Sequence, residues 1–168
     1  MNVIKATLEE LPDIVLLNAI VQKMHHQAHP DIFKPVGDES GVERLFERIL
    51  EQENNHVFMA YLANAPVGYA WAAVEARPDF ALKHGRKQVY IHQIAVHERY
   101  RKQGIGRALF QTIEDLAEQQ GITHLELDSW AFNTDAHAFF EKLGFETYNI
   151  KMWKKGEHHA VHRNHRRF

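Results

Sequence analysis

The sequence of 168 residues contains no cysteine, which excludes disulfide bonds, thiolate metal ligands and a cysteine nucleophile. That absence fits a reducing compartment, so a cytoplasmic location is expected. No apolar run is long enough to span a bilayer, and residues 1–5 lack a signal-peptide core, so no membrane association is expected. Neither charge sign is in clear surplus: the net charge of −2 gives no general case for binding nucleic acid.

Hydrophobic residues make up 45% of the sequence, which is typical of a globular chain able to bury a full core. We find no internal repeat and no linker, so residues 1–154 are predicted to form a single domain. Only residues 155–168 differ, as a basic tail rich in histidine, of which the chain has 13. A solvated tail is the simplest interpretation, with adventitious metal binding, contact with an anion or nucleic acid, and capping of a neighbouring subunit as alternatives.

Hydrophobic periodicity and turn signals predict alternating elements along the chain. Strands are expected at residues 2–6, 56–63, 67–76, 87–96, 122–130 and 145–154. Helices are expected after Thr7, from Ser40, over residues 104–120 and over residues 134–143. Thr7 and Ser40 are each followed three residues later by glutamate, which is the spacing of a capping box.

The most informative stretch is residues 93–110, which reads as an apolar strand, a basic turn with glycines and an amphipathic helix. Unpaired N–H groups and the dipole at a helix N-terminus attract phosphate. Gly104 and Gly106 place no Cβ in the path of a ligand that approaches the backbone. Basic side chains surround the same point: Arg101, Lys102 and Arg107. The stretch therefore predicts a phosphate or pyrophosphate site, with an ordinary helix start as the alternative.

Two better-known nucleotide motifs are missing from this stretch. The sequence has no Gly-x-x-x-x-Gly-Lys-Ser/Thr, and Leu109 stands where a dinucleotide-binding motif would have its third glycine. Residues 101–106, Arg-x-x-Gly-x-Gly, instead resemble the Gln/Arg-x-x-Gly-x-Gly/Ala signature of the GNAT superfamily of N-acetyltransferases. Residues 133–145 are similar to that family's Asn-x-x-Ala-x-x-Phe-Tyr-x-x-x-Gly-Phe segment, and the element order extends the resemblance from about residue 2 to about residue 154.

The resemblance implies an α/β (α+β) fold with a mixed, mostly antiparallel central sheet and helices on both faces, in the order β-α-α-β-β-β-α-β-α-β. It also implies that acetyl-CoA (coenzyme A) lies between two splayed strands, the one ending at Val96 and the one over residues 122–130. Backbone groups of Ile94, Ala95 and Val96 would line the pantetheine arm, and Asn133 and Phe140 would contact it. The pyrophosphate would lie on the turn formed by Arg101, Lys102, Gln103, Gly104, Ile105, Gly106 and Arg107.

Phe140 departs from the family pattern, which often has tyrosine there to protonate the departing thiolate of coenzyme A. Phenylalanine has no proton to donate. Another group or a water could serve as the acid, the thiolate could leave without help, or the protein could bind acyl-CoA without efficient turnover. Acid assistance is typically worth about 10²–10⁴-fold, so its loss slows an enzyme without stopping it.

An amine acceptor must lose a proton before it attacks a thioester, and His92 matches the family position that often faces the acceptor. Tyr90 shares its strand face, so His92 and Tyr90 are the predicted catalytic residues. A packed strand histidine is the alternative for His92. Glu75 and Asp128 are rival bases, and each also reads as a structural carboxylate.

The acceptor site is expected at the loop after the first helix and on the facing hairpin, where aromatic and acidic groups would suit a cationic amine. The predicted substrate-binding residues are His25, His29, Phe33, Trp71 and Glu75. His25-His26-x-x-His29 could also hold a metal ion, but no carboxylate follows at helical spacing, and no metal site is predicted.

The predicted function is acetyl transfer from acetyl-CoA to a primary amine of a small molecule or peptide, by direct attack in a ternary complex. A non-catalytic acyl-CoA-binding sensor or regulatory module on the same fold is the alternative, since Phe140 lacks the acid. A nucleic-acid-associated protein is suggested by the tail alone. A homodimer is expected because the resemblance suggests one and twofold assemblies are common.

Overall fold

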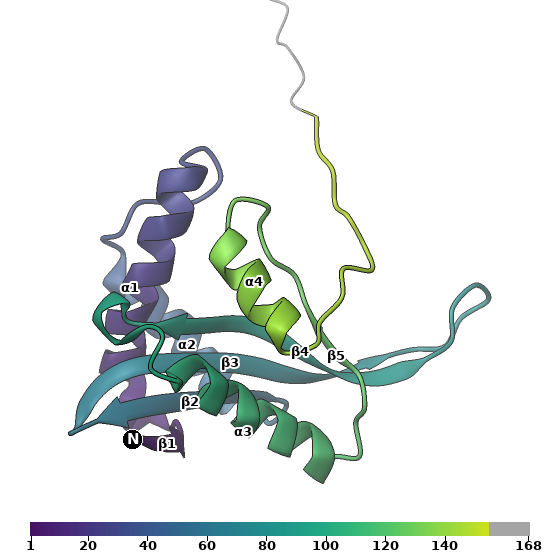
Figure 1. Ribbon diagram of the computed structural model, residues 1–168, viewed down its shortest axis with the longest axis horizontal. Helices are drawn as coiled ribbons and strands as arrows, with labels where there is room; N and C mark the ends of the chain where they lie inside the picture. Colours follow the sequence, from purple (N-terminus) through teal and green to yellow (C-terminus); the bar gives the residue numbers. More distant parts are fainter. Residues whose placement is uncertain (155–168) are drawn as a thin grey trace, which may run out of the picture. The chain divides into compact units, whose positions relative to one another are not determined.

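The computed structural model describes residues 1–154, and the predicted basic tail lies outside the described residues. The chain falls into two compact units, Met1–Phe132 and a second that begins at Asn133. The first unit holds the whole sheet and three α-helices: α1 (Leu11–Ala28), α2 (Glu39–Glu51) and α3 (Ile105–Gln119) (Figure 1). The second unit holds α4 (Thr134–Lys142).

The five-stranded sheet has the order β1-β2-β3-β4-β5. Its strands are β1 (Asn2–Lys5), β2 (Asn55–Leu62), β3 (Ala65–Arg77), β4 (Arg86–Val96) and β5 (Leu125–Leu127). Pairing is antiparallel from β1 to β4, and β5 runs parallel to β4 because α3 crosses over between them. The predicted mixed, mostly antiparallel sheet is therefore confirmed.

The helix starts follow from local side-chain capping. The Thr7 capping box is confirmed: the Thr7 N–H donates to the Glu10 carboxylate at 2.7 Å, and a short 3-10 helix leads into α1. The predicted cap at Ser40 is wrong, because the Asp38 carboxylate accepts the Gly41 N–H at 3.0 Å and α2 begins earlier. Aspartate is the stronger N-cap, since its charge also complements the helix dipole.

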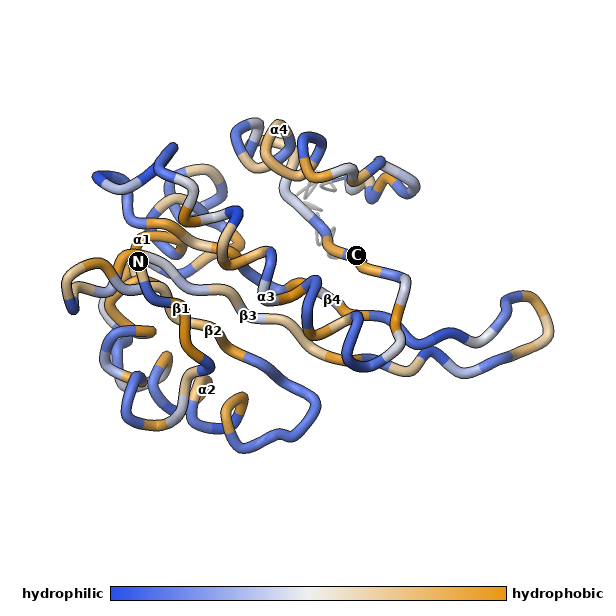
Figure 2. Tube along the Cα trace, turned by 60° about the horizontal axis from the view of Figure 1, so that its bottom comes forward, coloured by the Kyte–Doolittle hydropathy of each residue, from blue (hydrophilic) through white to orange (hydrophobic). Residues whose placement is uncertain are grey.

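Helices cover both faces of the sheet, and hydrophobic residues line the central strands (Figure 2). One cluster lies between the sheet and the pair α1 and α2: Ala6, Leu11, Ile14, Leu17, Phe46, Ile49, Val57, Met59, Tyr69 and Ala95. α3 covers the opposite face. A Cβ on Gly68 would meet Leu109 and Ile105 of α3, whereas the next residue, Tyr69, packs against Phe46 of α2.

The second unit is a short helix with a defined cap at each end. The Asn133 side chain accepts the Ala136 N–H at 3.3 Å and caps the start of α4. At the other end, Gly144 adopts a φ of 89°, and the Phe145 N–H donates to the Phe140 carbonyl at 3.0 Å. The rings of Phe140 and Phe145 lie 5.4 Å apart, which completes a Schellman motif with its hydrophobic contact.

Two predicted strands differ in the structure. The strand expected at residues 122–130 is only Leu125–Leu127, because the Ile122 N–H is used by the C-terminal cap of α3, where it donates to the Ala117 carbonyl. No strand forms over residues 145–154. The alternation of Tyr148, Ile150 and Met152 predicts one, but the described part of the second unit contains no neighbouring strand to pair with.

At Gly68, both α3 and β4 lie close to the backbone of β3. In Gly68→Ala, the Cβ would lie 2.7 Å from the Ala95 carbonyl oxygen, which belongs to paired backbone. We expect the free energy of unfolding to decrease by about 1–3 kcal/mol, measured by urea denaturation. Gly121→Ala is the control: its Cβ meets nothing within 4 Å, so only its φ of 64° adds a cost of about 1 kcal/mol. A smaller loss in Gly68→Ala than in the control would contradict the close approach.

Candidate active site

β4 extends beyond its parallel neighbour and leaves part of its edge unpaired. Pairing with β5 ends at Ile91, and within residues 1–154 no strand pairs with that edge over residues 92–96, which we term the open edge. The His97 N–H donates to the Val67 carbonyl of β3 at 2.8 Å. Because backbone groups alternate sides along a strand, those of Ile94 and Val96 face the open edge.

β4 carries one extra residue at His92. Opposite it on β3, Trp71 pairs with Gln93, while Ala72 pairs with the residue before His92, so His92 has no partner of its own. This β-bulge turns the side chains of His92 and Gln93 to the same face of the sheet. The His92 ring stacks on Trp71 with centroids 4.1 Å apart, and the Tyr90 ring meets its edge at 4.9 Å.

Burial keeps the imidazole of His92 neutral. Desolvation is the main influence and lowers the pKa of His92 below its ordinary value, while the charges of Glu75 and Asp128 oppose the shift by raising it. Near neutral pH the ring is therefore an uncharged proton acceptor. The structure thus brings the two predicted catalytic residues, His92 and Tyr90, into contact.

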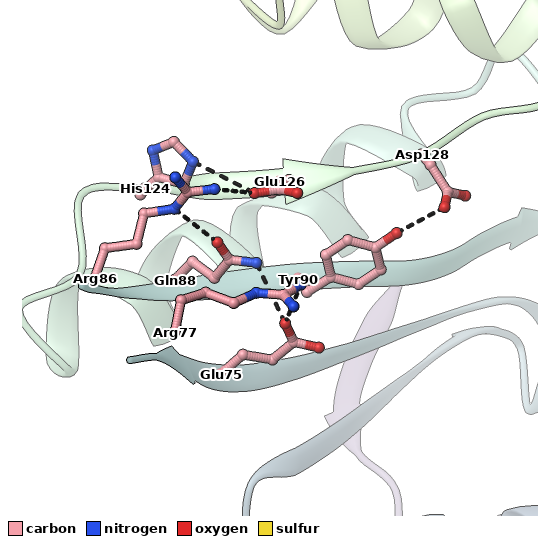
Figure 3. Close-up of polar contacts among 8 residues, drawn as sticks. All are labelled: Glu75, Arg77, Arg86, Gln88, Tyr90, His124, Glu126 and Asp128. Atoms are coloured by element: carbon pink, nitrogen blue, oxygen red, sulfur yellow. Dashed lines mark hydrogen bonds and ion pairs between the residues drawn. The ribbon is translucent and has the colours of Figure 1, made fainter. Parts of the chain in front are cut away.

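Polar contacts cross the sheet beside Tyr90 (Figure 3). The Glu75 carboxylate accepts a hydrogen bond from Gln88 at 3.2 Å and forms an ion pair with Arg77 at 2.9 Å. The buried Gln88 amide oxygen accepts in turn from Arg86 at 3.0 Å. The charge of Glu75, a predicted substrate-binding residue, is thus already matched by an arginine on its own strand.

Two more carboxylates extend this network to β5 and the segment that follows it. Glu126 pairs with Arg86 at 2.8 Å and lies 3.6 Å from His124. Asp128 accepts the Tyr90 hydroxyl at 2.9 Å, and no cation pairs with Asp128 in the described chain. Burial first and Asp128 second raise the pKa of Tyr90, so the phenol stays protonated as a donor. Asp128 is therefore the carboxylate here whose charge no arginine balances.

The turn before α3 has the backbone shape that suits an anion. Lys102 and Gly104 both adopt positive φ, at 60° and 82°, and the first intrahelical bond of α3 is from the Ala108 N–H to the Gly104 carbonyl. Within residues 1–154, the N–H groups of residues 102–107 meet no acceptor. The position of a Cβ on Gly104 has nothing within 4 Å, so a ligand can approach the backbone there. The residues present thus fit a pyrophosphate.

The basic side chains of this turn are divided among different contacts. Arg101 Nε donates to the Val96 carbonyl at 3.3 Å, which brings its guanidinium to the open edge. Arg107 lies along α3, where it is 3.7 Å from Glu114. The amide of Gln103 turns back and donates to the Arg99 carbonyl. Arg101 and Arg107 are thus engaged in other contacts, while the backbone N–H groups of this candidate anion site have no acceptor in the described chain.

The loop after α1 joins an aromatic cluster within the first unit. The His25 ring lies 4.7 Å from Phe33, and the His29 ring lies 5.3 Å from Trp130. Phe33 meets Trp130 at 5.1 Å, and Phe132 lies 5.6 Å from both histidines. The structure thus gathers three predicted substrate-binding residues, His25, His29 and Phe33. Trp71 instead lies under His92, and Glu75 lies in the polar network.

Trp130 and Phe132 are members of this aromatic cluster that the sequence prediction missed. Both lie in the segment that follows β5; the expected strand would have ended at Trp130, and Phe132 lay beyond it. Their rings contact His29, in the loop after α1. The segment that follows β5 therefore turns toward that loop instead of pairing with β4 beyond Ile91, where the open edge begins. Two aromatic residues at i and i+2, just beyond a strand that borders the cofactor motif, are the signal that could have identified them.

The second unit contains the remaining predicted cofactor residues. The Asn133 oxygen is used for the cap of α4, which leaves its amide N–H groups available to a ligand. Phe140 has its ring against Phe139 at 5.1 Å and Phe145 at 5.4 Å. Phe140 therefore has a structural role in ending α4.

Among residues 1–154, no three histidine or acidic side chains are placed to hold a metal ion. No helix in that part of the chain combines the length and apolar character needed to cross a membrane.

Comparison with known proteins agrees with this geometry. The profile of the Acetyltransferase (GNAT) family matches residues 21–145. YycN of Bacillus subtilis (strain 168), an uncharacterized N-acetyltransferase, is 28% identical over 112 residues, covering 66% of this chain and 68% of the relative. A crystal structure of the tetramutant of the BH1408 protein from Bacillus halodurans matches with a TM-score of 0.84 at 25% identity, over 92% of this chain and 99% of that one.

The aminoglycoside acetyltransferase AAC(6')-Iy, solved with a bisubstrate analog, has a TM-score of 0.73 at 17% identity, over 93% of this chain and 97% of that one. At that identity the likeness concerns the fold alone. The family profile, by contrast, spans most of the sequence, including the strand and turn that form the open edge and the anion site. This chain belongs to the GNAT acetyltransferase family.

Proposed function

We propose that this protein is an acetyl-CoA-dependent N-acetyltransferase that acts on a primary amine of a small molecule or peptide, by direct attack in a ternary complex. The observation that carries the proposal is His92, a half-buried neutral imidazole on a bulge at the open edge of β4. An ammonium acceptor must give up a proton before its nitrogen can attack, and a base at this point would take it.

Acetyl-CoA would supply the acetyl group as an activated thioester. The backbone groups of Ile94 and Val96 at the open edge would hydrogen-bond the amides of its pantetheine arm, as a neighbouring strand would. The N–H groups of residues 102–107 would hold its pyrophosphate, and the Asn133 amide would donate to the arm.

The polar side chains of the site would manage the acceptor's charge and its proton. The unbalanced carboxylate of Asp128, held by the Tyr90 hydroxyl, would attract the ammonium form. A ring nitrogen of His92 would then accept the proton and leave a neutral amine. The aromatic cluster of His25, His29 and Phe33 would contact the rest of the acceptor.

Protonation of the departing thiolate is the step for which Phe140 offers no group. Its ring belongs to the cap of α4, so a structural reason favours an aromatic residue there without a hydroxyl being needed. A water, another side chain or unassisted departure would then complete the reaction. An acyl-CoA-binding sensor is the second candidate, and Phe140 is the observation that favours it.

Gly104→Asp should abolish acetyl-CoA binding, because it adds bulk and negative charge where the pyrophosphate would lie. Isothermal titration with acetyl-CoA measures this, with desulfo-CoA and ATP as comparison ligands. Gly121→Asp is the matched control, because it also has positive φ and open space but lies at the other end of α3. Unchanged affinity in Gly104→Asp would remove the anion site from this turn.

The wild-type kcat/KM should decrease as pH falls through the lowered pKa of His92, because a protonated imidazole cannot accept a proton. His92→Ala should lower turnover about 100-fold or more, most at the acidic end of the range in which His92 is neutral. Free-thiol release with a panel of amines follows the reaction. His56→Ala is the control, since the pKa of His56 is also lowered by burial. A loss that is constant across pH would exclude His92 as the base.

Phe140→Tyr should raise turnover, up to the roughly 10²-fold at the low end of acid assistance, if the missing acid limits the rate. Phe139→Tyr, on the neighbouring position of the same helix, controls for the added hydroxyl. Thiol release again provides the measurement. An unaltered rate would mean that another group already protonates the thiolate, while no thiol release from any variant, with acetyl-CoA still bound, would favour the sensor.

A further inference from the structure

Three side chains beside the bulge, on the α1 face of the sheet, form a closed set of hydrogen bonds. The Asn18 amide donates to the Tyr69 hydroxyl at 2.9 Å and to the Gln93 side-chain oxygen at 3.2 Å. The Tyr69 hydroxyl donates to that same oxygen at 2.5 Å. The three residues come from α1, β3 and β4, Tyr69 is fully buried and Asn18 is 8% exposed. We call this set the Asn18–Tyr69–Gln93 triad.

We propose that the Asn18–Tyr69–Gln93 triad holds the bulge of β4 in place and so positions His92 and the open edge for the reaction. The three side chains are positioning residues, since none of them needs to touch the substrate. The inference rests on the proposed function for its catalytic meaning, while the triad's effect on the bulge is independent of any substrate.

The register explains why the triad needs the bulge. Side chains alternate faces along a strand, so Gln93 reaches the α1 face only because His92 is an extra residue. In a regular β4, Gln93 would point to the opposite face, where α3 presents Leu109 and Ile105. Those side chains offer no hydrogen-bond partner to an amide. The Tyr69 hydroxyl would lose its acceptor at the same time, and leaving buried polar groups unpaired is unfavourable.

The bulge in turn decides which groups the site presents. It places Gln93 beside His92 on one face, and leaves the His92 ring without a cross-strand partner, stacked on Trp71 and half-buried. It also shifts the alternation of backbone groups by one residue. With the bulge, Ile94 and Val96 face the open edge, whereas a regular strand would present Gln93 and Ala95 there.

The test compares Tyr69→Phe and Gln93→Met, which remove a donor and an acceptor at nearly constant volume, with their double variant. One measurement is the ring titration of His92, followed by NMR on histidine-labelled protein and assigned with His92→Ala. The groups that face this ring are Trp71, Tyr90, Glu75 and Asp128, and none of them is altered. The other measurement is acetyl-CoA affinity by isothermal titration. Ile113→Val, in the buried core of α3, is the control for general loss of stability.

We expect each single variant to raise the pKa of His92 toward its ordinary value, because the ring leaves its half-buried position. We also expect each to weaken acetyl-CoA binding about tenfold. A change of that size corresponds to the loss of about one hydrogen bond between the ligand and the open edge. The double variant should be no worse than either single one, since the triad acts as one unit. Ile113→Val should change neither quantity.

An unchanged His92 titration in both single variants would overturn the triad's role, and so would an equal change in Ile113→Val. Tyr69→Phe is the milder variant and keeps the test informative if Gln93→Met fails to fold. If wild-type protein does not bind acetyl-CoA, the proposed function fails, and the His92 titration still decides whether the triad holds the bulge.

Discussion

One extra residue in β4 sets the geometry on which the site depends. Because His92 has no partner on β3, the strand bends there, and β5 stops pairing at the residue before it. The unpaired backbone that follows runs into the turn before α3, whose N–H groups also lack acceptors in the described chain. A candidate proton acceptor, a strand-like edge and a candidate anion site are therefore consecutive along one short segment of the sequence, and no distant loop is needed to assemble them.

The fold was largely predictable from the sequence because capping residues and glycines mark where its helices begin and end. Thr7 forms the capping box at the start of the first helix. Gly121 and Gly144 adopt positive φ just after α3 and α4 and so end these helices. The prediction of Ser40 as a cap was wrong because two capping residues lie close together. The charge of Asp38 favours it as the cap of α2. Residues 145–154 alternate as a strand does, but alternation shows only a suitable face, and a strand also needs a neighbour.

The sequence could name candidate site residues where they belong to motifs, and could not where their placement depends on strand register. The glycine turn and His92 follow from residue types at fixed spacing. The bulge was not predicted, although the alternation of apolar residues passes from Val89 and Ile91 to Ile94 and Val96, as one extra residue requires. Trp130 was assigned to the end of a strand and Phe132 was given no role, because their contacts are with the loop after α1, which lies far away in the sequence. The balance of Glu75 by Arg77 likewise appears only in three dimensions.

The open edge of β4 also bears on edge-to-edge pairing with a strand of another chain. A row of unpaired N–H and C=O groups is a template on which a strand of another chain can assemble, and long flat edges promote aggregation. Here the unpaired stretch is short, and the bulge at His92 breaks its regular spacing. A strand of another chain in regular register cannot pair across the bulge at His92. A flexible ligand with a few amides can still match the backbone groups of the open edge that follow it. The bulge therefore disfavours strand pairing by other polypeptides along the exposed backbone of the open edge.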